Sequence, residues 1–278
     1  MGGSAVRSAN GQVRWVLCML MAASCASGTV DRKESGRTAA SDKDADQCAD
    51  RGALPTTGLY VTTPLNRPVP ESVLADPNIT GIAVRVGWRE LQPTAQAPRF
   101  ELIDQQLAAA RHHQKKVSLS IEAGVETPDW VYALGARPFP IVLDEGSGDR
   151  ACQRAKLPVP WDPVYLDSFR HLIAAAGRRY NRSHLLAHVK VTGIAGSGPA
   201  LAVPHGAAHR VQGPNQACDT QDEVQQWLDF GYSRARIETT WRELVALFTQ
   251  SFSAHRLSLV VDAQGFPENL IVGTQGRE

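Results

Sequence analysis

The sequence lacks an excess of either charge. Lys and Arg together number 29 and Asp and Glu together 28, which leaves a formal net charge of +1 at pH 7. Such a balance gives no electrostatic reason to expect binding to nucleic acid or to an anionic membrane surface. The sequence also lacks a glycine-rich phosphate loop followed by Lys-Ser or Lys-Thr, a paired CxxC motif and an HExxH motif. We therefore expect no cofactor and no metal.

Long apolar runs are scarce, and the one nearest the N-terminus extends only from Trp15 to Ala23. It is too short to cross a bilayer as a stable helix, so residues 1–28 are predicted to form an export signal. The box AASC ending at Cys25 resembles a bacterial lipoprotein cleavage site. Two alternatives follow: lipidation at Cys25, which would tether the protein to a membrane, or ordinary cleavage near residues 26–28. Either one predicts a periplasmic or cell-envelope location, whereas an apolar N-terminus without export is the remaining interpretation.

Residues 29–52 are polar and nearly free of large apolar side chains. They are predicted to be a disordered linker, followed by one domain at residues 53–278. Beyond the signal lie Cys48, Cys152 and Cys218. In an oxidising compartment Cys152 and Cys218 are candidates for a disulfide, because both fall in long loops that we expect on the same face. Three isolated thiols are the alternative.

Short apolar runs alternate with helical patterns, which is typical of βα units around a parallel sheet. Strands are expected at residues 58–62, 81–88, 117–123, 188–194 and 257–261. Helices are expected at residues 102–113, 128–131, 163–180, 222–230 and 233–254. Two apolar runs between residues 139 and 159 predict a hairpin, and residues 203–220 are expected to form a loop. The fold class is therefore α/β. Five to six such units would not close an eight-stranded TIM-like (β/α)8 barrel, so a barrel built from them is incomplete, or the strand count is about two too low.

Three segments between Gly81 and Pro204 occur in a specific order. They are GIAVRVGWRELQP at 81–93, VSLSIEAG at 117–124 with TPDWV at 127–131, and LPVPWDP at 157–163 with GRRY at 177–180. Together they resemble glycoside hydrolases of the barrel clan that uses two catalytic glutamates, in particular the β-galactosidase-like families. The resemblance implies a TIM barrel with a carbohydrate substrate or ligand.

The family's two glutamates project from the ends of strands four and seven. In this sequence the fourth expected strand leads into AGSGPA at residues 195–200, which contains no carboxylate, and no seventh strand is recognisable. A retaining glycosidase needs two carboxyl groups roughly 5 Å apart. The resemblance therefore implies weak or absent hydrolysis. A non-catalytic saccharide-binding or surface scaffold protein is the alternative, and a truncated gene product is a third.

Two other carboxylates are candidates for catalysis. Glu122 lies near the end of the third expected strand, and Asp262 ends the fifth. The alternative for Glu122 is a structural ion pair with Arg85 on the neighbouring strand. Asp162 and Asp222 are expected to cap or precede helices rather than to act on a substrate.

Four aromatic residues fall at or just beyond the carboxyl ends of expected strands: Tyr60, Trp88, Trp130 and Trp161. The apolar face of a sugar stacks on such rings, so these residues are predicted to bind substrate, with Arg85 bonding to hydroxyls. Ordinary packing is the alternative for each. His205 and His209 have the spacing of a metal pair, but neighbouring Gly and Pro residues argue against a helix there, and we expect no metal site.

Overall fold

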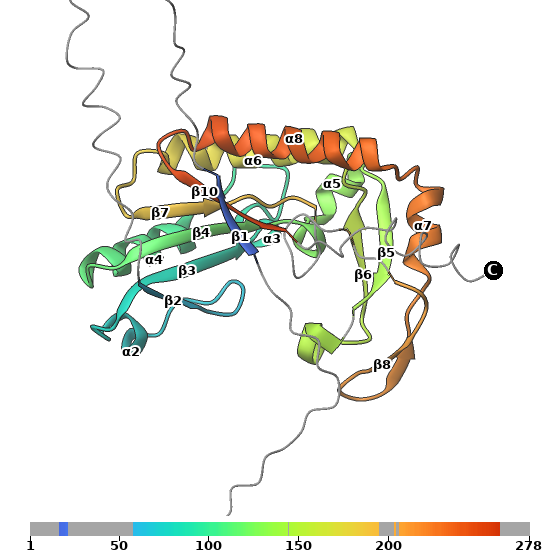
Figure 1. Ribbon diagram of the computed structural model, residues 1–278, viewed down its shortest axis with the longest axis horizontal. Helices are drawn as coiled ribbons and strands as arrows, with labels where there is room; N and C mark the ends of the chain where they lie inside the picture. Colours follow the sequence, from blue (N-terminus) through green and yellow to red (C-terminus); the bar gives the residue numbers. More distant parts are fainter. Residues whose placement is uncertain (1–16, 22–57, 144, 195–202, 204–205, 262–278) are drawn as a thin grey trace, which may run out of the picture.

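The computed structural model describes residues 17–21, 58–143, 145–194, 203 and 206–261 (Figure 1). A six-stranded sheet forms its centre, in the order β1-β10-β7-β4-β3-β2. The strands are β1 (Leu17–Met21), β2 (Leu59–Thr62), β3 (Ile79–Gly87), β4 (Lys116–Glu122), β7 (Leu186–Lys190) and β10 (Arg256–Val261). All five strands predicted from the sequence are present in this sheet.

The five strands from β2 to β10 are parallel and lie in chain order, each beside the one before it. A doubly wound sheet would reverse direction at a switch point, whereas a barrel adds strands continuously on one side. The described chain is therefore a mixed α/β fold with a five-stranded parallel sheet, consistent with a partial TIM-like barrel. At its far edge, β1 pairs with β10 in antiparallel orientation.

Helices connect the parallel strands. They are α2 (Glu71–Leu74), α3 (Trp88–Leu91), α4 (Glu101–His112), α6 (Pro163–Tyr180) and α8 (Arg234–Ser251). Helix α6 has the predicted bounds because Pro163 occupies its first turn and the Asp162 carboxylate accepts hydrogen bonds from the N–H groups of Val164 and Tyr165. Helices α6 and α8 lie side by side (Figure 1).

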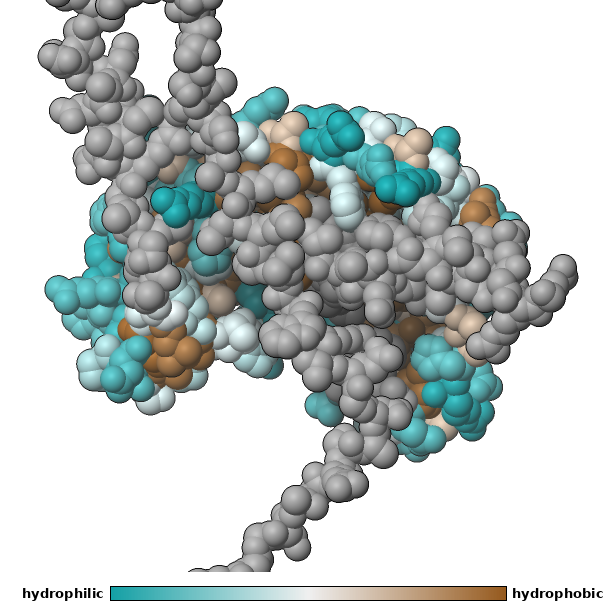
Figure 2. Space-filling view, viewed as in Figure 1, coloured by the Kyte–Doolittle hydropathy of each residue, from teal (hydrophilic) through white to brown (hydrophobic). Residues whose placement is uncertain are grey.

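The two faces of the sheet differ because side chains alternate along each strand. On one face Ile82, Val84 and Val86 of β3 pair with Val117, Leu119 and Ile121 of β4, and all six are buried. This face belongs to the same hydrophobic core as α4, α6 and α8. The residues between them are smaller or polar and point to the opposite face. At the edge, Leu59 of β2 is 58% exposed, and Figure 2 shows hydrophobic surface at that end of the molecule.

A long excursion separates β4 from α6. It contains η1 (Gly124–Glu126), α5 (Asp129–Ala133), β5 (Pro138–Val142), η2 (Glu145–Arg150) and β6 (Arg154–Pro158). Strands β5 and β6 pair in antiparallel orientation, which confirms the predicted hairpin. Figure 1 shows this excursion beyond the carboxyl ends of the parallel strands, where barrel enzymes build their sites.

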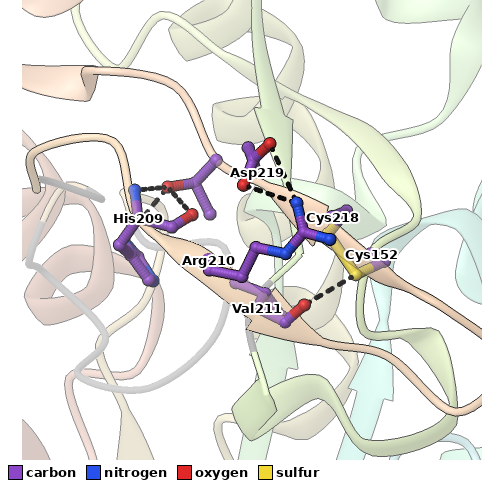
Figure 3. The surroundings of a disulfide bond; sticks show 7 residues. Cys152, His209, Arg210, Val211, Cys218 and Asp219 are labelled. Carbon is purple, nitrogen blue, oxygen red and sulfur yellow. Dashed lines mark hydrogen bonds and ion pairs between the residues drawn. A yellow bond between two sulfur atoms is a disulfide. The ribbon is translucent and has the colours of Figure 1, made fainter.

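The expectation of a loop throughout residues 203–220 is wrong. Strands β8 (Arg210–Gln212) and β9 (Ala217–Asp219) form a short hairpin before α7 (Glu223–Asp229). Each strand has only three residues and Val211 is the one fully buried apolar side chain, so no alternating pattern marks it. A disulfide between Cys152 and Cys218 ties this hairpin to the excursion (Figure 3). The pairing considered from the sequence is thus confirmed.

The fourth parallel strand begins and ends earlier than expected. Strand β7 ends at Lys190, not Ile194, although the next two residues still bond to the neighbouring strands β10 and β4. The N–H of Val191 donates to the carbonyl of Ser258, the Thr192 hydroxyl donates to the carbonyl of Ile121, and Gly193 adopts a φ of 124°. That φ favours glycine, so the chain turns away from the sheet at this point.

Among the described residues, no helix has the length and apolarity to cross a membrane.

Candidate functional site

One face of the parallel sheet carries a continuous set of polar side chains, which we call the polar face. It comes from four adjacent strands and comprises Tyr60, Arg85, Ser118, Ser120, Glu122, His188 and Lys190. Each of these residues alternates with a residue of the opposite face. The polar face gathers Tyr60, Arg85 and Glu122, three of the residues predicted from the sequence.

Glu122 is the centre of the polar face at the carboxyl end of β4. Its Oε1 accepts hydrogen bonds from the Ser120 hydroxyl at 2.9 Å and from Nε of Arg85 at 3.2 Å, and Nζ of Lys190 lies 3.8 Å away. The Glu122 side chain is 18% exposed, that of Lys190 21% and that of Arg85 39%. The ion pair with Arg85 that we considered as the alternative role for Glu122 is therefore present.

A second cluster lies one layer closer to the amino ends of the strands. The Ser118 hydroxyl and Nε2 of His188 are 2.7 Å apart, and the ring of Tyr60 lies 6.0 Å from that of His188. Burial lowers the pKa of His188, which keeps the imidazole neutral near pH 7. Burial raises the pKa of Tyr60, so its hydroxyl stays protonated. Both rings are uncharged hydrogen-bonding groups.

The position of Tyr60 depends on a glycine on the next strand. A Cβ atom built on Gly81 would overlap Cε1 of Tyr60. The ring therefore lies directly over β3, which brings it toward His188. A larger residue at position 81 would displace Tyr60 from the polar face.

Trp88 and Trp130 lie beside each other but outside the polar face. Their rings meet edge to face with centroids 5.8 Å apart, and both Nε1 atoms donate to Gln92, at its side-chain and main-chain oxygens. Trp88 is 0% exposed and also packs on Phe169. The structure thus leaves no ring face of Trp88 open for stacking on a sugar, contrary to the role predicted for it, whereas Trp130 is half-buried.

Trp161 lies in a third place, where the β6–α6 connection meets α8. Its ring packs 5.7 Å from Trp227 and 6.0 Å from Tyr232, and the Arg236 guanidinium lies 6.0 Å from it. Its Nε1 is buried without a hydrogen-bond partner among the described residues. The aromatic residues predicted to bind substrate are therefore divided among three places.

Asp262, the second candidate for catalysis, lies outside the described residues, as do residues 195–202 after β7. The two helix caps are confirmed, because the Asp222 carboxylate accepts from the N–H of Gln225 as Asp162 does in α6. His205 lies outside the described residues as well. No group of three His, Cys, Asp or Glu side chains suited to a metal ion occurs within the described ranges.

Sequence reasoning missed Glu126 in η1, which follows β4. Its side chain is 13% exposed and forms an ion pair with Arg150 at 3.6 Å. Gly87 provides the room, since a Cβ there would lie 2.7 Å from Oε2 of Glu126. Oδ1 of Asn66 accepts a hydrogen bond from the N–H of Gly87 at 2.7 Å. The missed residues of the polar face are Ser118, Ser120, His188 and Lys190. They were detectable as polar residues that alternate with apolar ones within expected strands.

Comparisons with known proteins give a limited result. No family model matches the sequence, and no curated protein does. Among solved structures, a β-galactosidase from the psychrophilic Marinomonas ef1 is similar, with 13% identity and a TM-score of 0.47 over 72% of this chain and 36% of that one. A β-galactosidase from the Antarctic haloarchaeon Halorubrum lacusprofundi is similar with 16% identity and a TM-score of 0.36 over 53% and 23%. The chain thus spans about a third or less of the length of these enzymes.

Proposed function

We propose that this protein binds or acts on carbohydrate through a barrel related to β-galactosidase-like glycoside hydrolases, and that its hydrolytic activity is weak or absent. The observation that carries the proposal is the polar face, where Glu122 is surrounded by donors at the carboxyl end of the parallel sheet. The sequence resemblance between residues 81 and 204 gives the ligand class.

The chemistry of the polar face suits a sugar. A hydroxyl group both donates and accepts hydrogen bonds, so a saccharide is recognised best by acceptors and donors in alternation. Glu122 offers acceptor oxygens, whereas Arg85 and Lys190 offer charged donors on either side of it. Tyr60 adds an aromatic ring on the same face. This set can hold a sugar ring by several hydroxyls at once.

The segment after β7 argues against efficient hydrolysis. Retaining and inverting glycosidases both use two carboxyl groups across the scissile bond, roughly 5 to 9.5 Å apart. In the family that the sequence resembles, one of the two follows the fourth strand, and the segment AGSGPA at residues 195–200 supplies no carboxylate there. This difference favours the binding-only alternative over catalysis.

We also propose that the protein is exported. The predicted signal at residues 1–28 is the main support, and the Cys152–Cys218 disulfide is consistent with it because disulfides persist in oxidising compartments. Cell fractionation followed by intact-mass measurement tests this proposal. An acylated N-terminal Cys25 indicates a lipoprotein, cleavage near residues 26–28 indicates a released protein, and an intact N-terminus in the cytosolic fraction contradicts export.

The function itself is tested by calorimetric titration of the mature chain with a panel of oligosaccharides, alongside hydrolysis of aryl β-galactosides. We expect binding without product, and a loss of binding in Glu122→Gln. Glu101→Gln, at an exposed position at the start of α4, is the matched control. Failure to bind any saccharide would overturn the proposal. Clear turnover that disappears in Glu122→Gln would instead show that the protein is an active hydrolase.

A further inference from the structure

A cavity lies away from the polar face, between the N-terminal halves of α6 and α8. Its volume is about 600 Å³, within the range of sites for small ligands. Trp161 and Arg170 line it from the side of α6, and Arg236, Thr239 and Glu243 line it from α8. We call this cavity the α6–α8 pocket.

The Trp161 ring forms an aromatic wall of the α6–α8 pocket, and packing against other aromatic residues fixes its position. Its ring packs on Trp227, which is fully buried and stacks at 3.6 Å on Phe139 of β5. A ring fixed in this way loses little side-chain entropy when a ligand stacks on it. The apolar face of a sugar ring is a suitable partner for such a surface.

The charged side chains of the pocket favour an anionic ligand. Arg170 and Arg236 supply two guanidinium groups against the single carboxylate of Glu243. Arg170 is paired with Asp167 at 3.0 Å, but both side chains are more than half exposed, so water weakens this attraction. Arg236 donates through Nη1 to the carbonyl of Gly231 and keeps the guanidinium 6.0 Å from the Trp161 ring. A guanidinium has five donors, so both arginines retain capacity for a ligand.

The backbone around the pocket also favours an anionic ligand. The N-terminal end of α8 lies beside the pocket, and the positive end of a helix dipole attracts anions. Ser233, the N-cap of α8, lines the pocket together with Thr239 of the next turns. Both residues are exposed. The Ser233 hydroxyl accepts the N–H of Arg236, the Thr239 hydroxyl donates to the carbonyl of Ala235, and each oxygen can form a further hydrogen bond. An aromatic face, two hydroxyls and two guanidinium groups therefore lie around one cavity.

We propose that the α6–α8 pocket binds an acidic sugar, a ring that carries a carboxylate such as a uronic acid. The sugar stacks on Trp161, and its carboxylate lies between Arg170 and Arg236. Guanidinium and carboxylate groups match in geometry and charge, which makes arginine the preferred partner for this substituent. The proposal concerns a site separate from the polar face and does not depend on Glu122.

Calorimetric titration of the mature chain with digalacturonic acid tests the proposal, and the fully methyl-esterified disaccharide is the matched neutral probe. We expect binding of the acid and at least fivefold weaker binding of the ester. An exposed ion pair contributes up to about 1 kcal/mol, which corresponds to a change in affinity of about fivefold. Arg170→Gln should therefore weaken binding of the acid, and Glu243→Gln should strengthen it by removing a repulsive charge.

Two further variants locate the binding. Trp161→Ala should abolish it, and Trp161→Phe, which retains a ring, should restore part of it if the loss is not caused by unfolding. Glu101→Gln, at an exposed position at the start of α4, should leave the affinity for digalacturonic acid unchanged. The proposal is overturned if the ester binds as tightly as the acid, or if Arg170→Gln and Glu243→Gln change nothing. It is also overturned if inorganic sulfate alone competes fully with the disaccharide, or if a folded Trp161→Ala variant binds the disaccharide as tightly as the native protein.

Discussion

Nε of Arg85 lies 3.2 Å from Oε1 of Glu122, across the junction of β3 and β4. The register pairs Arg85 with Ser120 and Gly87 with Glu122, so the arginine reaches diagonally along the sheet to the carboxylate. The same oxygen accepts from Ser120, and Lys190 of β7 approaches it from the other side. One carboxylate thereby joins three adjacent strands. This arrangement makes Glu122 a shared acceptor, which suits ligand binding and stability together.

The first prediction concerns the coupling between Arg85 and Glu122. Because the Arg85 side chain is 39% exposed, we expect Arg85→Gln and Glu122→Gln each to lower the free energy of unfolding by no more than about 1 kcal/mol. Each should lower saccharide affinity about tenfold, and the double variant should lose little more, because contacting residues that act as a unit are not additive. Urea unfolding and calorimetric titration of the four proteins provide the comparison. Fully additive losses of affinity would show that the two side chains act independently.

A second prediction separates packing from binding among the tryptophans. Trp88 is fully buried against Trp130 and Phe169, so Trp88→Ala should lower the free energy of unfolding by about 3–5 kcal/mol. Trp130→Ala should cost less, because Trp130 is half-buried. Urea denaturation measures both. If Trp88→Phe keeps its stability and yet loses saccharide binding, Trp88 has a direct role in the site.

The third prediction concerns the disulfide. Cys152 and Cys218 are 66 residues apart, and closing a loop of that length restricts the unfolded chain by about 4 kcal/mol in the chain-entropy description. The double variant Cys152→Ser and Cys218→Ser should therefore be less stable by about 2–4 kcal/mol. Thermal unfolding of the native protein with and without reductant should give a shift of similar size. An unchanged midpoint would mean that the disulfide does not constrain the unfolded state.

The fourth prediction is a pH dependence of stability. Burial lowers the pKa of His188 and of His255 below the ordinary value of 6.5. As the pH falls below 6.5, the unfolded chain therefore takes up protons before the folded protein does, and stability declines toward the folded pKa values. The decline should not exceed about 1.4 kcal/mol per pH unit for each histidine.

Urea unfolding between pH 7.5 and 5.0 measures this slope. His188→Gln should reduce it, and the double variant with His255→Gln should reduce it further, because a glutamine takes up no proton in either state. A slope equal to that of the native protein in both variants would assign the acid sensitivity to other groups.

Much of the fold was predictable because its signals are local. The bounds of α6 follow from Pro163, the Asp162 cap and a regular apolar spacing, all within one segment. The β5–β6 hairpin was recognisable from two apolar runs around a turn. The end of β7 was not, because Val191 and Ile194 continue the apolar pattern past Lys190, whereas the positive φ of Gly193 bends the backbone. The β8–β9 hairpin was missed because its short strands carry almost no apolar pattern.

The sequence by itself determined the alternation of strands and helices, the polar positions within each strand and the cap residues, since each depends on neighbours along the chain. Only the tertiary structure decided which of these residues meet. It brought Arg85, Glu122 and Lys190 together from three strands, buried Trp88 in the core, and placed Trp161 beside Arg236 in a separate pocket. The physical reason is that strand register and helix packing set distances between residues far apart in the chain, and no local pattern encodes those distances.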